Sequence, residues 1–126
     1  MMRLTHALPL AVIFTAVLAA TPASAADMDH GKKLVHQRCQ ICHQLVKDKK
    51  KIGPSLFDVV GRKAGTESYY TYSKALKDSG LTWDDATLDK WIENPHKLVK
   101  GTKMSFPGIK KADQRADIIA YLKTLK

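Results

Sequence analysis

The sequence is poor in cysteine, with only two among its 126 residues, and both lie in Cys39-Gln40-Ile41-Cys42-His43. It has no second cluster of Cys and His, although a structural zinc site usually needs four ligands in paired clusters. It also has no alternating pattern of strands and helices, which is the setting of a thioredoxin-like redox dithiol. A structural disulfide between Cys39 and Cys42 stays open, but it would leave His43 without a role.

Long hydrophobic runs are missing after the first 25 residues. Within residues 1–25, Arg3 is the one charged residue, an apolar run ends at Ala20, and small residues precede Ala25. This order is typical of a secretory signal peptide that is cleaved after Ala25, with cleavage after Ala26 as the second choice. The alternative is a retained membrane anchor, but the uninterrupted apolar stretch is short for a span of about 20 residues.

Acidic residues are also scarce: 12 Asp and Glu stand against 21 Lys and Arg, which gives a net charge of +9. Such a balance favours encounter with nucleic acid, anionic lipid or an acidic protein. Export to a bacterial periplasm, as the signal peptide predicts, argues against nucleic acid. We therefore expect residues 26–126 to form one small, soluble, monomeric domain without stable membrane insertion.

The motif around the two cysteines is the attachment signature of a c-type haem. Its two-residue gap sets the thiols one short turn apart, which suits the vinyl groups on adjacent pyrroles. Each thiol can become a thioether, and the histidine then lies under the ring, where its imidazole can bind the iron. The motif predicts one covalent haem c, anchored by Cys39 and Cys42 and ligated by His43.

Short helices and long loops are expected along the rest of the chain. The predicted helices span about 30–39, 73–79, 82–94 and 111–125. Asp29, Ser73 and Thr82 are the expected N-caps of the first three of these helices. The stretch 44–71 has little periodicity, and so long an irregular segment is unusual unless it wraps something. A haem is a natural object to wrap, and the pattern predicts an all-α fold around it.

The second iron ligand must come from another part of the chain. Met104 is the only methionine after the haem motif, and it lies in a loop, 101–108, that two glycines and a proline shape. A thioether favours ferrous iron, so a His/Met pair would raise the potential. The alternative is that Met104 fills a gap in the core. Two ligands would leave no open position, which favours electron transfer over an oxygen- or peroxide-activating enzyme or a gas sensor.

From Gly31 to the C-terminus, the chain resembles the class I cytochromes c, most closely the mitochondrial group and its small bacterial relatives. The segments that carry the resemblance are Cys39-Gln40-Ile41-Cys42-His43, Gly53-Pro54-Ser55-Leu56, Gly61-Arg62-Lys63, Tyr70-Thr71-Tyr72-Ser73, Gly80-Leu81-Thr82-Trp83, Glu93-Asn94-Pro95, Gly101-Thr102-Lys103-Met104 and Arg115 to Leu122. The resemblance implies the small cytochrome c fold, an electron-transfer role rather than an enzyme, and a close crossing of the first and last helices at Gly31.

The resemblance also implies a set of cofactor-binding residues. These are Cys39, Cys42, His43, Pro54, Arg62, Tyr72, Trp83, Met104 and Phe106. His43 and Met104 would ligate the iron, and the Pro54 carbonyl would fix the imidazole. Arg62, Tyr72 and Trp83 would offset the desolvation of the buried haem propionates, whereas the alternative for the two aromatic residues is ordinary core.

The chain departs from the family pattern at three places, two of which concern the surroundings of the iron. Trp91 stands where the family usually has a tyrosine, and Leu76 where it often has an asparagine. Both changes would make the distal pocket drier. The loop between His43 and Gly53 is one residue shorter than in the mitochondrial proteins and lacks their histidine.

Basic residues from four parts of the chain would ring the exposed haem edge in the resembled fold. They are Lys33, Arg38, Lys51, Lys97, Lys103, Lys110 and Lys111. Such a ring would steer acidic redox proteins into weak, transient docking, although surface lysines can also be there only for solvation. The implied partners are a quinol–cytochrome c reductase and, as acceptor, cytochrome c oxidase or a photosynthetic reaction centre.

Overall fold

The computed structural model describes residues 24–126, so nearly all of the predicted signal peptide, 1–25, lies outside it. Its helices are α1 (Met28–Leu34), α2 (Lys74–Asp78), α3 (Asp85–Glu93), α4 (Pro95–Leu98) and α5 (Ala112–Leu122), and a π-helical turn, η1 (Val35–Cys39), extends α1. The described residues contain no strand, only one isolated bridge between Lys63 and Thr82. The prediction of an all-α fold with short helices and long loops is confirmed.

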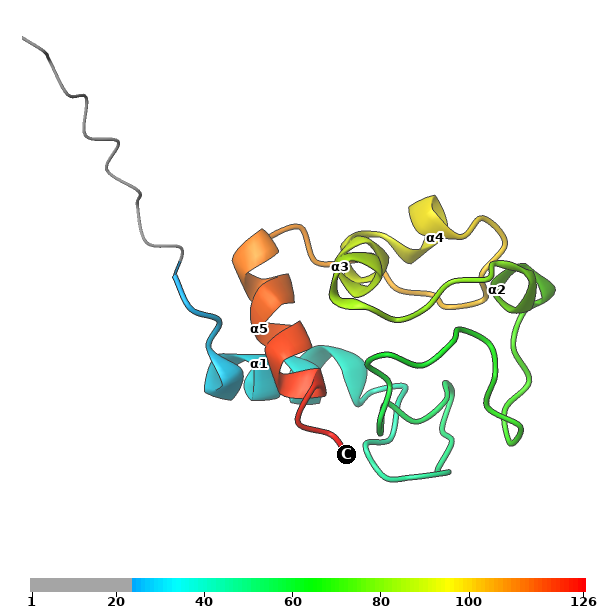
Figure 1. The fold of residues 1–126 in the computed structure, drawn as a ribbon, viewed down its shortest axis with the longest axis horizontal. Helices are drawn as coiled ribbons and strands as arrows, with labels where there is room; N and C mark the ends of the chain where they lie inside the picture. Colours follow the sequence, from blue (N-terminus) through cyan, green and yellow to red (C-terminus); the bar gives the residue numbers. More distant parts are fainter. Residues whose placement is uncertain (1–23) are drawn as a thin grey trace, which may run out of the picture.

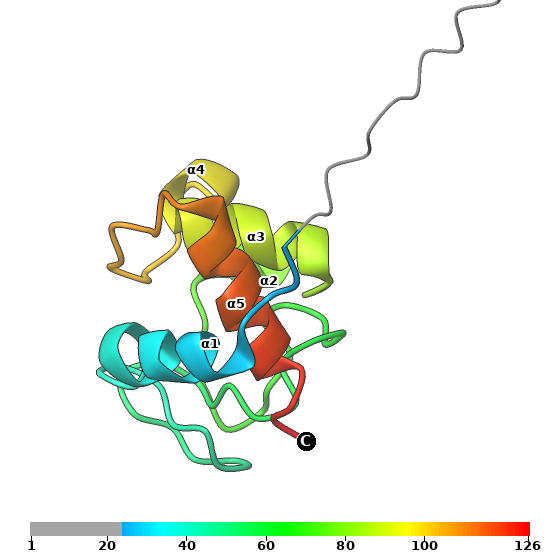
Figure 2. The same cartoon turned by 90° about the vertical axis from the view of Figure 1, so that its left-hand side faces the viewer.

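The first and last helices cross at close range, as Figures 1 and 2 show. Gly31 makes the crossing possible, because a Cβ at this position would lie 2.5 Å from the carbonyl carbon of Asp117. Val35 and Ile118 are almost completely buried beside the crossing. The helix pair therefore forms one wall of the core, and η1 carries the chain from this wall directly into the cysteine motif.

Two helix starts differ from the prediction. Asp27, not Asp29, caps α1, since its carboxylate accepts hydrogen bonds from the amides of Asp29 and His30, each at 3.0 Å. Asp84, not Thr82, caps α3 by accepting from the Thr87 amide at 2.8 Å. Each true cap has extended backbone, which lets its side chain reach back to the first turn.

The other predicted boundaries agree more closely with the structure. Ser73 caps α2, and its hydroxyl accepts from the Leu76 amide at 3.1 Å. Asn94 ends α3 and also caps α4, where its side chain accepts from the Lys97 amide at 3.1 Å. Because Pro95 has no amide hydrogen to lose, it fits the first position of α4.

The segment 44–72 has no helix and lies at the lower right of the molecule in Figure 1. Ser55, which is 1% exposed, organises it from inside. The Ser55 hydroxyl donates to the Val46 carbonyl at 2.7 Å, and its amide donates to the Tyr69 hydroxyl at 3.1 Å. The loop is thus tied to itself by buried hydrogen bonds, which the sequence pattern did not reveal.

A buried arginine side chain joins α5 to the segment that follows the loop 101–108. Arg115 is 6% exposed, and its guanidinium donates to the Asp89 carboxylate at 2.6 Å. It also donates to the carbonyls of Ile109 at 3.0 Å and Lys110 at 2.8 Å. These bonds fix the segment before α5 against α3. None of the described helices is both long and apolar enough to cross a membrane.

Candidate cofactor-binding site

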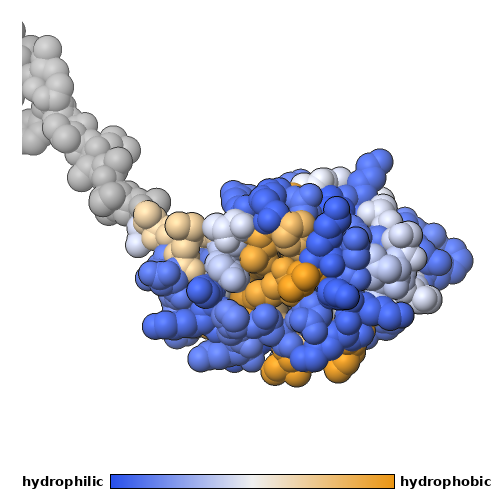
Figure 3. Space-filling model, turned by 90° about the horizontal axis from the view of Figure 1, so that it is seen from below, coloured by the Kyte–Doolittle hydropathy of each residue, from blue (hydrophilic) through white to orange (hydrophobic). Residues whose placement is uncertain are grey.

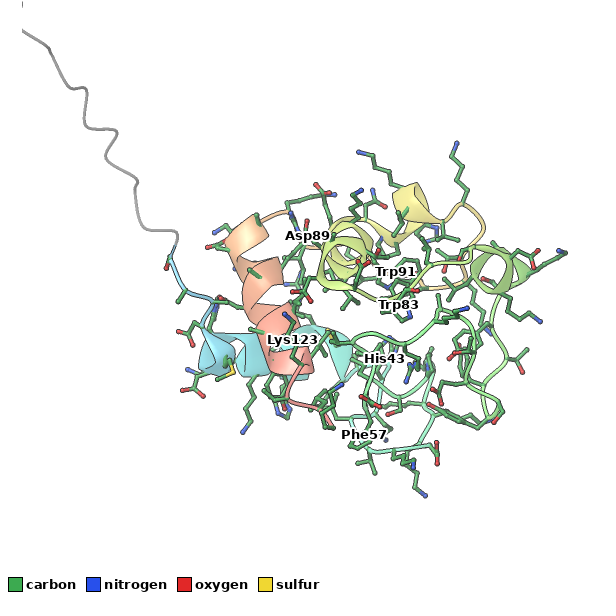
Figure 4. The ribbon with its side chains drawn as sticks, in the orientation of Figure 1. His43, Phe57, Trp83, Asp89, Trp91 and Lys123 are labelled. Atoms are coloured by element: carbon green, nitrogen blue, oxygen red, sulfur yellow. The ribbon has the colours of Figure 1, made fainter. Side chains whose placement is uncertain are left out.

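One cavity, lined mainly by apolar side chains, lies between the helices and the long loop. Its lining includes all nine of the predicted cofactor-binding residues: Cys39, Cys42, His43, Pro54, Arg62, Tyr72, Trp83, Met104 and Phe106. Figure 4 shows His43 below Trp83 and Trp91, with His43 coming from the loop after η1 and Trp91 from α3. The fold thus gathers at one place residues that lie far apart in the sequence.

The His43 imidazole is held in a fixed orientation. It is 9% exposed, and its Nδ1 lies 2.7 Å from the Pro54 carbonyl oxygen. A carbonyl can only accept, so Nδ1 carries the proton and Nε2 keeps a free lone pair. Burial lowers the pKa of His43, and the bond to Pro54 only partly offsets this, so the ring is held neutral. A neutral, oriented imidazole is what a metal ligand requires.

Gly53 is a site residue whose role beside His43 was not predicted from the sequence. A Cβ at this position would lie 2.5 Å from Cε1 of His43. The Gly53 amide also donates to the Cys42 carbonyl at 2.7 Å. The glycine therefore lets the segment before Pro54 pass directly against the imidazole, and the Gly-Pro pair was the sequence signal that could have indicated it.

The two thiols lie one turn apart at the edge of the cavity. The amides of Cys42 and His43 both donate to the Cys39 carbonyl, at 3.0 and 2.9 Å, and the thiols are not joined to each other. Burial raises the pKa of the Cys39 thiol to about 11, although Arg38 partly opposes the shift. A redox dithiol needs a thiol that ionises readily, so this environment favours an attachment role.

Met104 approaches the cavity from the loop 101–108. Its amide donates to the Thr102 hydroxyl at 3.3 Å, and its carbonyl accepts from the Phe106 amide at 3.1 Å. Thr102 is 6% exposed and also lines the cavity. Gly108 closes the loop with φ +88°, where a Cβ would lie 2.7 Å from the Glu93 carbonyl carbon. The loop is therefore turned back against α3, with Met104 half-buried on its inner side.

Arg62, Tyr72 and Trp83 line the same cavity. The Arg62 guanidinium donates to the carbonyls of Ser55 and Phe57, at 3.2 and 3.1 Å, and pairs with Glu67 at 3.1 Å. Burial raises the pKa of the Tyr72 phenol to about 12, so it stays a hydrogen-bond donor. Arg62 is thus already partly neutralised by Glu67, a partner that the sequence analysis did not predict.

Two of the three departures from the family pattern, Leu76 and Trp91, lie on the cavity wall. Leu76 and Trp91 are each 8% exposed and both line the cavity. The Trp91 ring packs against Trp83 with centroids 5.0 Å apart and planes inclined by 54°. At both positions the wall is formed by a large, mainly apolar side chain, and the drier pocket expected from these two residues stays a prediction.

The basic residues predicted for docking are all exposed, and two of them, Arg38 and Lys103, also line the cavity. Lys51 donates to the Gln40 carbonyl at 2.8 Å, and Lys110 to the Glu93 carbonyl at 3.3 Å. Figure 3 shows one face on which hydrophilic residues surround a central apolar patch. Hydrophilic residues therefore cover much of this face around the apolar patch.

The donor set fits one kind of prosthetic group. Two thiols, one oriented imidazole and one thioether meet at an apolar cavity, and these are the groups that attach and ligate a c-type haem. The described residues contain no cluster of three or more His, Cys, Asp or Glu that could hold a metal ion by itself.

Comparisons with known proteins agree with this geometry. The family model described as cytochrome c matches residues 28–126. Cytochrome c2 of Rhodopila globiformis is 50% identical over 104 residues, which cover 82% of this chain and 98% of the relative. Cytochrome c2 of Rhodomicrobium vannielii is 45% identical over 119 residues, with coverages of 94% and 95%.

A solved structure supports the same assignment. Cytochrome cH from Methylobacterium extorquens has a TM-score of 0.74 at 49% sequence identity, and the match covers 79% of this chain and 99% of that one. Similarity at this level, over nearly the full length of each relative, extends to the fold and to the chemistry of the family. The chain therefore belongs to the cytochrome c family, whose members carry covalently bound haem c and transfer electrons rather than act as enzymes.

Proposed function

We propose that this protein is a soluble, exported one-electron carrier in which Cys39 and Cys42 attach one haem c, and His43 and Met104 ligate its iron. The observation that carries the proposal is the convergence of these four side chains on a single cavity. Bound there, the haem would supply a reversible one-electron couple. With both axial positions filled, no site would be left for a substrate.

The surroundings of the two ligands support a rigid redox centre. His43 is fixed by Pro54 at 2.7 Å, and the Met104 amide is fixed by the buried Thr102 at 3.3 Å. Ligands that keep their positions let the iron change charge with little reorganisation. The mainly apolar wall would keep water from a haem bound there, and this would raise its potential by disfavouring the ferric charge.

The propionates would lie near Arg62, Tyr72 and Trp83. Tyr72 supplies a neutral hydroxyl and Trp83 an indole N–H, while Arg62 supplies a charge that Glu67 shares. Glu67 already neutralises part of the Arg62 charge. We therefore propose that the hydroxyl of Tyr72 and the indole N–H of Trp83 offset more of the free-energy cost of burying the propionates than the guanidinium does.

The proposed partners rest on the basic surface charge of the protein, and the proposed location rests on the predicted signal peptide. We propose that residues 1–25 direct export to a periplasm and are removed. The exposed basic residues would then steer the carrier to acidic sites on a quinol–cytochrome c reductase and on a terminal oxidase or similar acceptor. Brief, weak docking would suit a carrier that must leave quickly.

Two measurements on the purified protein test the proposal. Optical spectra of both oxidation states should show a low-spin haem with a methionine-to-iron charge-transfer band in the ferric form. After denaturation and extraction, the haem should stay with the polypeptide, and in the Cys39→Ala/Cys42→Ala variant it should be lost. A polypeptide free of covalent haem would contradict the proposal, and a high-spin ferric spectrum would contradict the ligation by Met104.

A further inference from the structure

Tyr70 is a partly buried residue on the rim of the cavity to which no role has yet been given. Its hydroxyl donates to the Ile52 carbonyl at 2.9 Å. Its ring lies under Lys103, whose Nζ is 4.7 Å from the ring centroid. The same ammonium donates to the carbonyl of Thr71. Tyr70 therefore contacts two segments that are far apart in the sequence.

The first of these segments holds the proximal side of the site. Ile52 directly precedes Gly53, which passes against the His43 ring and donates to the Cys42 carbonyl at 2.7 Å. Pro54 follows and accepts from His43. The hydroxyl of Tyr70 is thus anchored one residue away from the backbone that orients the imidazole.

The second segment carries the other ligand. Lys103 directly precedes Met104, and its side chain reaches across the rim to Tyr70 and Thr71. In the described part of the chain, the bond from Lys103 to the Thr71 carbonyl is the one hydrogen bond between residues 103–108 and a residue outside the 101–108 loop. The ammonium has three donors, so it can bond the carbonyl and lie over the ring face at the same time.

We propose that Tyr70 and Lys103 form a clamp that holds the Met104 loop closed over the cavity by joining it to the segment that orients His43. Tyr70 is a positioning residue in this arrangement, because it acts through the two ligand-bearing segments. A second contact stiffens the clamp: Tyr72, on the cavity wall, meets the Tyr70 ring edge-on, with centroids 4.9 Å apart. The inference rests on the proposed function, in which Met104 ligates haem iron.

Binding of imidazole to the ferric holoprotein tests the clamp, since an external ligand must displace Met104 and open its loop. Tyr70→Leu removes the hydrogen bond and the ring face together, and Lys103→Gln removes the cation. We expect each variant to bind imidazole about fivefold to tenfold more tightly than the wild type. The double variant should bind imidazole less tightly than the sum of the two single changes predicts, because both variants lose the contact between the Lys103 ammonium and the Tyr70 ring. Lys100→Gln, an exposed neighbour in the chain, is the matched control and should not change the affinity.

Tyr70→Phe divides the effect, because it keeps the ring under Lys103 and removes only the bond to Ile52. We expect an intermediate affinity. Folding of every variant is checked by thermal melting, and if Tyr70→Leu does not fold, Lys103→Gln and Tyr70→Phe carry the comparison. Imidazole affinities within twofold of the wild type in folded variants would overturn the clamp.

Hydrogen exchange at the Met104 and Phe106 amides tests the clamp without reference to the iron. We expect faster exchange in Lys103→Gln and unchanged exchange in Lys100→Gln, whereas equal rates in both would overturn the clamp. A wild type without the methionine-to-iron band would instead contradict the ligand assignment, and the clamp would then be judged by exchange alone.

Discussion

Gly31 and Asp117 meet at the crossing of α1 and α5, where the space for a side chain on residue 31 is taken by the backbone of Asp117. A Cβ at Gly31 would lie 3.2 Å from the Ile118 amide nitrogen as well. Backbone atoms in the middle of a helix cannot rotate away as a side chain can. The approach of the two helices is therefore set by the absence of one side chain.

Gly31→Ala should destabilise the protein by about 2 kcal/mol, because the helices must move apart to admit the methyl group. Denaturant unfolding of the holoprotein measures the effect. Lys33→Ala, an exposed change on the same helix, is the control and should shift the stability by less than about 0.5 kcal/mol. A Gly31→Ala protein as stable as the control would show that the crossing can relax.

Asp117 makes stability depend on pH at the same crossing. Its carboxylate accepts from His30 and from the Asp27 amide, each at 2.7 Å, and these bonds hold the pKa of Asp117 below its usual range. A lowered pKa in the folded state contributes stability above the unfolded value of about 4, and that stability is lost as pH falls through the folded value. Asp117→Asn should therefore be less stable than the wild type at pH 7, and the difference should shrink in acid.

Asp48→Asn is the control for this pH dependence, because Asp48 is exposed and Asn tolerates its positive φ of 55°. Unfolding curves of the three proteins between about pH 3 and pH 7 give the comparison. A stability difference for Asp117→Asn that stays constant over this range would mean that the carboxylate charge is not what stabilises the helix start.

Met104→Ala should abolish the low-spin His/Met spectrum, since no other side chain of the 101–108 loop offers a soft donor. The methionine-to-iron band of the ferric protein is the measurement. Met28→Ala, at an exposed position of α1, should leave the band unchanged. If the Met104→Ala spectrum equals that of the wild type, another residue is the sixth ligand.

Charge reversal at Lys97 should slow electron transfer to an acidic redox protein at low salt, because the encounter depends on long-range attraction. The second-order rate constant should fall about threefold to tenfold for Lys97→Glu at low ionic strength, and the difference should vanish as salt screens the charges. Lys77→Glu, on α2 and outside the proposed docking set, should have a smaller effect. Equal rates for Lys97→Glu and the wild type would contradict steering at this position.

Several features could be predicted because the information is local. The cysteine motif can be recognised from five consecutive residues. The burial of Leu88, Trp91 and Ile92 on one face of α3 follows from their helical spacing. Helix starts were less certain, since Asp27 and Asp29 are equally good caps by composition, and Thr82 and Asp84 are both of residue types that cap helices. Only the backbone conformation decides between them, and it depends on how the preceding residues pack or pair, as Thr82 does with Lys63.

The long-range polar contacts could not be predicted, because each joins residues far apart in the chain. Arg115 with Asp89, Arg62 with Glu67, and Tyr70 with Lys103 are all pairs of ordinary surface residue types until the fold places them together. By itself, the sequence determined which groups are available to attach and ligate a haem, because thiol, imidazole and thioether chemistry is carried by residue type. Only the tertiary structure decided how these groups are held, because orientation comes from carbonyls, hydroxyls and rings supplied by distant segments.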